Sequence, residues 1–142
     1  MFLSLLLAAP LLPQASDDWL LVRSEAKQIG TISWEKIRDV YLPGRKVRIV
    51  PGAEGESTPS ASRLVVGTPR DNPAVVRIAA ELGIRYGDGQ ISWRGHTYGP
   101  GTGLIVATAD PDGQGRIALF TGADSMGVIN GFSISVSPFD DA

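Results

Sequence analysis

Apolar and polar residues follow one another along this chain in short blocks that are typical of strands and helices in alternation. Runs rich in β-branched residues and bounded by Gly, Pro or Asp predict strands. These runs cover 19–23, 46–50, 63–67, 103–108 and 116–121, and tight turns between shorter blocks predict a β-meander at 84–98. The order of elements predicts the α/β (or α+β) class, as a single domain with one mixed β-sheet of roughly five to seven strands and two to three short helices.

The helix expected at 72–82 has the clearest signals in the sequence. Asn72 is a good N-cap, Pro73 fits the first helical position, and Gly83 fits the left-handed position that ends a helix. Its apolar residues recur at helical spacing and are Val75, Ile78, Ala79 and Leu82. We therefore expect this helix to pack on the sheet between a central pair of parallel strands.

Two more helices are indicated by capping residues. Ser33 can cap a helix that Pro43 and Gly44 end, and the stretch 123–130 predicts a last short helix. The apolar face of the first of these comprises Trp34, Ile37 and Tyr41. Such a face is more typical of a core than of a ligand site.

The composition is that of a chain that can fold without cross-links. Its 142 residues fit one domain, and a hydrophobic fraction of 43% can supply a core. The absence of cysteine excludes disulfides, thiolate nucleophiles and zinc–thiolate sites. Residues 51–62, PGAEGESTPSAS, have no large apolar side chain and predict a flexible loop within a single domain at 17–142.

The N-terminal segment predicts export. Residues 1–16 have no charged side chain, and the run from Phe2 to Leu12 is apolar apart from Ser4. This run is too short to cross a hydrocarbon core of roughly 30 Å, but it fits the apolar region of a signal peptide. We expect a signal peptide at 1–16, a secreted or periplasmic mature chain and no transmembrane span. An uncleaved anchor or a wrongly assigned start is the alternative.

The distribution of charge argues against a nucleic-acid partner. The formal net charge is −2, and the basic residues of 19–50 are scattered over predicted strand, helix and turn. A nucleic-acid site usually needs a basic domain with Lys and Arg clustered on one face. We interpret the charges as a solvated surface.

The segment 67–73, Gly-Thr-Pro-Arg-Asp-Asn-Pro, joins a predicted buried strand to the helix at 72–82. Ligands of open α/β sheets bind beyond such strand ends, and the free N–H groups of a helix N-terminus favour an anion. Thr68, Arg70 and Asn72 are therefore the candidate ligand-binding residues. A purely structural connection is the alternative, because the loop lacks phosphate-binding glycines and Asn72 can itself occupy the helix N-terminus.

The loop Asp110-Pro-Asp-Gly-Gln-Gly115 begins like an EF-hand calcium loop, with acids at its first and third positions. Thr121 stands where the bidentate acid is needed, and the flanks are predicted strands, so a hairpin turn is favoured over calcium binding by Asp110 and Asp112.

Ser125 follows a predicted strand and precedes a predicted helix, as a nucleophilic serine does in hydrolases. The only histidine, His96, lies upstream of Ser125, whereas that order requires it downstream. A helix start capped by Asp124 or Ser125 is the favoured interpretation, and we predict no catalytic residue. A single histidine without cysteine also leaves no metal or cofactor set, and no cofactor is expected.

Four segments carry a resemblance to a known domain. Leu64-Val-Val-Gly-Thr-Pro-Arg-Asp-Asn-Pro73, Gly95-His-Thr-Tyr98, Gly101-Thr-Gly-Leu104 and the Asp110-Pro111 turn occur in this order. The order resembles an accessory α/β domain attached to secreted bacterial peptidases and esterases of the α/β-hydrolase type, over about residues 63–122. In that family the hydrolase chemistry belongs to the neighbouring domain. The resemblance therefore implies a noncatalytic module with no catalytic residue to carry over.

These observations predict an exported noncatalytic accessory or binding module, whose partner is a protein or an envelope component. The alternative is a small-anion or small-molecule binding protein that uses the crevice at 67–73. A minimal hydrolase that uses Ser125 is a third hypothesis, which the position of His96 disfavours.

Overall fold

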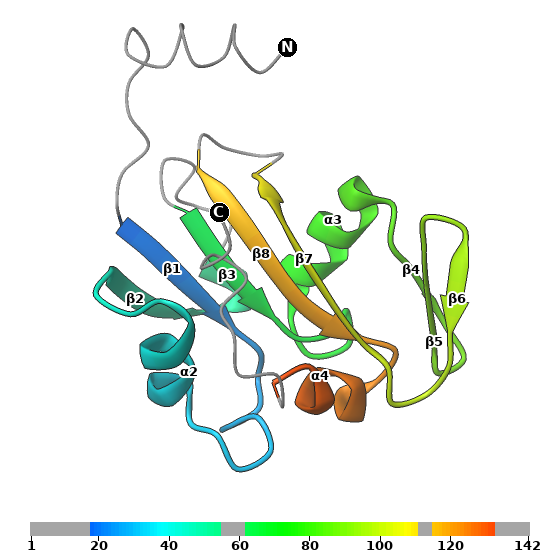
Figure 1. The fold of residues 1–142 in the computed structure, drawn as a ribbon, viewed down its shortest axis with the longest axis horizontal. Coiled ribbons are helices and arrows are strands. Elements are labelled where there is room, and N and C mark those ends of the chain that lie inside the picture. The colour runs from blue at the N-terminus through cyan, green and yellow to red at the C-terminus, as the bar shows by residue number, and fades with distance from the viewer. Residues whose placement is uncertain (1–17, 55–61, 111–114, 133–142) are drawn as a thin grey trace, which may run out of the picture.

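A five-stranded sheet forms the middle layer of the molecule (Figure 1). The computed structural model describes residues 18–54, 62–110 and 115–132. In spatial order the strands are β2 (Lys46–Pro51), β1 (Asp18–Arg23), β3 (Ser62–Val66), β8 (Arg116–Gly122) and β7 (Gly103–Ala109). Neighbours from β2 to β8 pair in parallel, and β7 pairs antiparallel with β8 at the edge. The predicted mixed α/β sheet with a central parallel pair is confirmed.

Helices cover both faces of this sheet. The helices α2 (Trp34–Tyr41) and α4 (Ser125–Gly131) pack on one face, and α3 (Pro73–Leu82) packs on the other. Because side chains alternate along a strand, Leu21 of β1 faces α2 while Leu20 faces α3. The chain leaves β1 toward one face and β3 toward the opposite face, so the topological switch point lies between these two strands.

The predicted meander forms a second, three-stranded sheet. Its antiparallel strands are β4 (Arg85–Gly87), β5 (Gln90–Trp93) and β6 (His96–Tyr98). Ile91 is buried in the core on the α3 side, and the indole Nε1 of Trp93 donates a hydrogen bond of 3.0 Å to the Leu82 carbonyl. The small sheet is thereby fixed to the end of α3.

The helix ends follow the predicted capping residues. The side chain of Ser33 accepts a hydrogen bond from the Lys36 N–H, and Gly83 ends α3 at φ 77°. At α4 the cap is Asp124, which accepts from the Gly127 N–H at 2.8 Å. Of the two caps proposed for α4, Asp124 is therefore the one used.

The segment 51–62, predicted to be a flexible loop, has regular structure at both of its described ends. Pro51 completes β2, Gly52–Glu54 form a 3-10 turn (η2), and Ser62 already belongs to β3. Residues 55–61 lie outside the described residues. Because β2 and β3 both pair with β1, no subdomain boundary separates the two strands.

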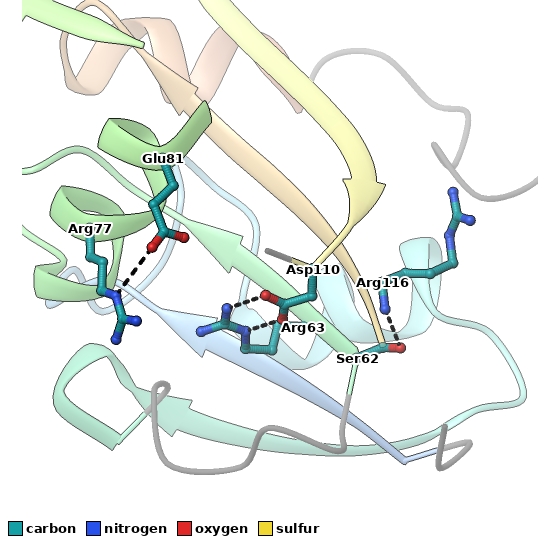
Figure 2. Close-up of polar contacts among 6 residues, drawn as sticks. All are labelled: Ser62, Arg63, Arg77, Glu81, Asp110 and Arg116. Carbon is teal, nitrogen blue, oxygen red and sulfur yellow. Dashed lines mark hydrogen bonds and ion pairs between the residues drawn. The ribbon is translucent and has the colours of Figure 1, made fainter. Parts of the chain in front are cut away.

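A buried ion pair ties β3 to the end of β7 across β8 (Figure 2). The Arg63 guanidinium donates from Nε and Nη2 to the two carboxylate oxygens of Asp110, both at 2.7 Å. Their side chains are only 3% and 1% exposed. Two parallel hydrogen bonds between charged groups fix the relative positions of these strands more firmly than a single contact would.

Breaking this pair from one side is expected to be costly. Arg63→Met or Asp110→Leu alone leaves the partner's charge buried, so each should lower the free energy of unfolding by about 3–5 kcal/mol. The double variant should lose less than the sum of the two, because it leaves neither charge behind. Urea unfolding of all four proteins measures this coupling.

Arg77→Met is the matched control for that experiment. Its contact with Glu81 on the surface of α3 is 3.6 Å long, and the two side chains are 54% and 35% exposed (Figure 2). Such a pair contributes at most about 1 kcal/mol. Equal losses in Arg77→Met and Arg63→Met would contradict the role given to the buried pair.

Candidate functional site

A cavity of about 360 Å³ lies beyond the carboxyl ends of β3 and β8. Three loops line it, and they comprise residues 68–70 before α3, 86–89 of the β4–β5 hairpin and 123–125 before α4. Side chains at this edge of a parallel sheet are the usual ligand-binding groups of α/β proteins. We take this cavity as the candidate functional site.

The wall formed by residues 68–70 is held rigid by its own hydrogen bonds. The Thr68 N–H donates to Asp71 Oδ1 at 2.8 Å, and the Arg70 N–H donates to Thr68 Oγ1 at 3.3 Å. Thr68 is 8% exposed. Arg70 is exposed, and no carboxylate among the described residues pairs with its guanidinium. The loop therefore offers one accessible cation on a fixed backbone.

Asn72 lies behind this wall and does not line the cavity. Its Nδ2 donates to the Val66 and Val22 carbonyls at 2.8 and 3.2 Å, and its Oδ1 accepts from the Ala74 N–H at 3.0 Å. It is 1% exposed. The structure thus places Thr68 and Arg70 at the cavity, while the polar atoms of Asn72 are occupied by the fold.

The opposite wall is the β4–β5 hairpin. Asp88 and Gly89 form its two-residue turn at φ 47° and 71°, the geometry for which Asp-Gly is a preferred sequence. The Tyr86 hydroxyl lies 2.7 Å from Thr121 Oγ1 of β8. Burial raises the pKa of Tyr86 to about 12, although the hydrogen bond with Thr121 opposes the shift. Tyr86 therefore stays a neutral phenol in ordinary buffers.

The third wall begins α4. The carboxylate of Asp124 accepts from the Gly127 N–H and, with both oxygens at 3.2 Å, from the Gly101 N–H. Its charge is therefore already stabilised by backbone donors. Ser125 at the first position of α4 is exposed and lines the cavity. The half-buried Asp124 also lines the cavity, so a small ligand would meet both the Ser125 hydroxyl and this carboxylate.

The lining combines hydroxyls with charges of both signs. Thr68, Tyr86 and Ser125 bring hydroxyls, while Arg70 and the exposed Asp88 face the site from opposite walls. Hydroxyls donate or accept hydrogen bonds as a ligand requires. This lining can hold a polar molecule, and its preference for one sign of charge depends on Arg70 set against two carboxylates, those of Asp88 and Asp124.

The sequence did not indicate Tyr86 and Asp88 as site residues, and it proposed Ser125 only as a nucleophile. The Asp-Gly sequence at 88–89 predicts a hairpin turn, but it does not predict which other segments lie next to that turn. The hairpin reaches the cavity because Trp93 and Ile91 pack the small sheet against α3. That contact joins segments whose association cannot be deduced from local patterns.

The other candidate residues lie apart from this cavity. His96 is exposed in β6 and is not among the residues that line the cavity with Ser125. β7 and β8 form the predicted hairpin, Asp110 binds Arg63, and Asp112 lies outside the described residues. Within 18–54, 62–110 and 115–132, no group of three or more His, Cys, Asp or Glu side chains is placed to hold a metal ion.

Asn72 is expected to be required for folding. Asn72→Ala removes the helix cap and leaves the Val22 and Val66 carbonyls without their side-chain donor, so the free energy of unfolding should fall by about 2–4 kcal/mol. Asn72→Asp keeps the capping acceptor but turns a carboxylate oxygen toward two carbonyls. Thermal and urea unfolding should show Asn72→Asp to be destabilised too; wild-type stability would contradict the importance of the Nδ2 bonds.

Tyr86 should make stability fall at high pH. Its folded-state pKa of about 12 lies above the ordinary value of 10.0, so its contribution is complete below pH 10 and is lost as the pH rises toward 12. Tyr86→Phe should weaken this alkaline loss, with a smaller part remaining because burial also raises the pKa of Tyr41. Urea midpoints across this range and absorbance of tyrosinate measure both effects; an identical decline in both proteins would contradict it.

No helix in the described part of the chain is long and apolar enough to cross a membrane. Comparisons with models of protein families, with curated proteins and with solved structures find no match to the chain. The resemblance over residues 63–122 therefore stays a prediction, and the site must be interpreted from its own geometry.

Proposed function

We propose that this domain is an exported, noncatalytic binding module that takes a small polar molecule with an anionic group in the cavity beyond β3 and β8. The observation that carries the proposal is the position of the cavity. It lies at the carboxyl edge of the sheet, where two parallel strands end and three loops meet, next to the switch point at which open α/β sheets usually bind their ligands. Its volume of about 360 Å³ suits a ligand of the size of a monosaccharide.

The expected ligand follows from the side chains that are available to it. The exposed Ser125 hydroxyl suits a polyhydroxylated body. The Thr68 hydroxyl already bonds Asp71 and the Arg70 N–H, and the Tyr86 hydroxyl already bonds Thr121, so these two offer only their remaining lone pairs. Arg70 has an accessible guanidinium, which binds carboxylate or phosphate oxygens through two parallel hydrogen bonds. Asp88 and Asp124 also line the cavity and oppose an anion, so the affinity for the anionic group depends on Arg70. A sugar phosphate or a sugar acid combines these properties.

A small ligand is favoured over a protein partner by the distribution of exposed apolar side chains. In the described part of the chain the large ones are Val40, Val76, Tyr98 and Met126. They lie on four different elements, α2, α3, β6 and α4. Apolar side chains scattered singly are normal on a soluble surface, whereas a protein interface shows a contiguous patch.

The test is binding of glucose 6-phosphate, with glucose as the neutral match. Glucose 6-phosphate should raise the melting temperature in proportion to the logarithm of its concentration, and glucose should raise it less. Arg70→Gln should weaken the binding about tenfold or more, because one charge-assisted contact is lost. Asp88→Asn should strengthen it, because a carboxylate facing the anion is removed and Asn keeps the preferred turn geometry.

Arg48→Gln is the matched control for the change in charge, because Arg48 is exposed on β2, which is at the opposite edge of the sheet from β7. It should bind as the wild type does. The opposite signs expected for Arg70→Gln and Asp88→Asn make the proposal specific. If both variants changed affinity in the same direction, or if no member of a panel of sugar phosphates and sugar acids bound, the proposal would be wrong.

A further inference from the structure

A second depression, of about 260 Å³, lies on the three-stranded sheet away from the cavity described above. Arg85 of β4, Arg94 of the β5–β6 turn, and the hydroxyls of Ser92 and Thr97 line it beside the ring of Trp93. Arg85, Ser92 and Thr97 are cross-strand neighbours in one row, because Arg85 pairs with Ser92 and Ser92 pairs with Thr97. The two hydroxyls are 2.8 Å apart. The depression thus presents two guanidinium groups and two hydroxyls on a regular strand framework.

Arg94 occupies a backbone position that arginine disfavours. It forms the two-residue turn between β5 and β6 with Gly95, and both residues have positive φ, 52° and 81°. Turns of this type prefer Asn, Asp or Gly at the first position, because a longer side chain is strained there. At the equivalent position of the other hairpin stands Asp88, which matches that preference. Backbone strain is therefore present at the Arg94 turn and absent from the Asp88 turn, and such strain is typical of residues with a functional role.

The Arg94 guanidinium lies over the indole ring of Trp93, 4.3 Å from its centroid. This stacking uses the face of the guanidinium and leaves the N–H groups at its edge for other acceptors. Trp93 is itself held by its hydrogen bond to the Leu82 carbonyl. The guanidinium is therefore positioned before any ligand arrives, which lowers the entropic cost of binding.

Neither arginine is neutralised by the protein. Within the described residues no carboxylate forms an ion pair with Arg85 or Arg94. Glu81, near the end of α3, is paired with Arg77. Among the residues that the structure describes, no acidic side chain lines the depression.

The C-terminal end of α3 is the feature that opposes an anion here, because helix carbonyls carry partial negative charge. Its effect is reduced by hydrogen bonding. The carbonyls of Ala79 and Ala80 accept from the backbone N–H groups that end the helix, and the Leu82 carbonyl accepts from Trp93. The full positive charges of Arg85 and Arg94 outweigh the remaining partial negative charge of these carbonyls, so the depression attracts an anion.

We propose that this depression is a second binding site, specific for a tetrahedral oxyanion such as a phosphate group. Arg94 contacts the anion through the edge of its guanidinium, and Arg85 contacts it from the neighbouring strand. The Ser92 and Thr97 hydroxyls bond each other, so one of them donates to the other and the second donates to the anion. Two arginines suit a doubly charged oxyanion better than a monovalent one. This site shares no residue with the cavity beyond the carboxyl ends of β3 and β8, so it does not depend on the function proposed for that cavity.

The test is a titration of the full chain with sodium phosphate against sodium chloride at matched ionic strength, followed by NMR. The side-chain N–H signals of Arg85, Arg94 and Trp93 should shift saturably with phosphate and little with chloride. Arg94→Asn should weaken the binding about tenfold or more, because a charge-assisted contact is lost. Arg85→Gln should weaken it in the same direction, and Arg70→Gln should leave these shifts unchanged because Arg70 lines the other cavity.

Arg94→Asn also separates binding from folding. Asn is preferred at this turn position, so the melting temperature of the variant should equal or exceed that of the wild type while phosphate binding is lost. Arg48→Gln provides a matched loss of one positive charge on β2 and should bind phosphate normally. Saturable binding that survives both Arg94→Asn and Arg85→Gln, or shifts that chloride reproduces, would overturn the proposal.

Discussion

The side chain of Asn72 fixes the geometry at the carboxyl edge of the sheet. Its amide joins the ends of β1 and β3 through the Val22 and Val66 carbonyls, and its oxygen begins α3. Gly52 and Gly67 lie so close to it that a Cβ at either position would meet Asn72. Two glycines, two strands and one helix are therefore arranged around a single amide group.

This amide also determines where the carboxyl edge of the sheet leaves open space. In open α/β sheets the crevice at the topological switch point is the usual site, and here that point lies between β1 and β3. Asn72 fills it, and the Glu25 N–H donates to the Asp71 carbonyl across the same gap. The cavity therefore lies one strand further along the sheet, at the ends of β3 and β8. Ala123 and Ser125, which follow β8, line it there. Arg63 and Asp110 lie at the opposite, amino end of β3, so the buried ion pair and the candidate cavity are at different ends of the same strand.

The sequence predicted the features that depend on neighbouring residues alone. The caps Ser33 and Asn72, the left-handed Gly83 and the buried face of α2 were all deducible, because each depends on residues within one or two turns. Thr68 and Arg70 were deducible as residues at a strand end. Tyr86 and Asp88 were not, since their approach to Arg70 depends on how the small sheet packs. The Arg63–Asp110 ion pair could not be predicted either, because the two residues are 47 positions apart and the pattern around Asp110 indicates a turn.

The small sheet carries two hairpins whose turns differ in what they contribute. The turn geometry at Asp88-Gly89 prefers this sequence, so the geometry alone explains why Asp88 occurs there. Asp88 also lines the cavity. Arg94-Gly95 adopts the same geometry against the preference of arginine, and stacking on Trp93 offsets only part of that strain. Most residues of a folded protein adopt backbone conformations that they prefer locally. A single residue that does not is expected to be there for the chemistry of its side chain. By this argument the proposed oxyanion site would explain the sequence of the arginine turn, whereas the turn geometry alone explains the sequence of the aspartate turn.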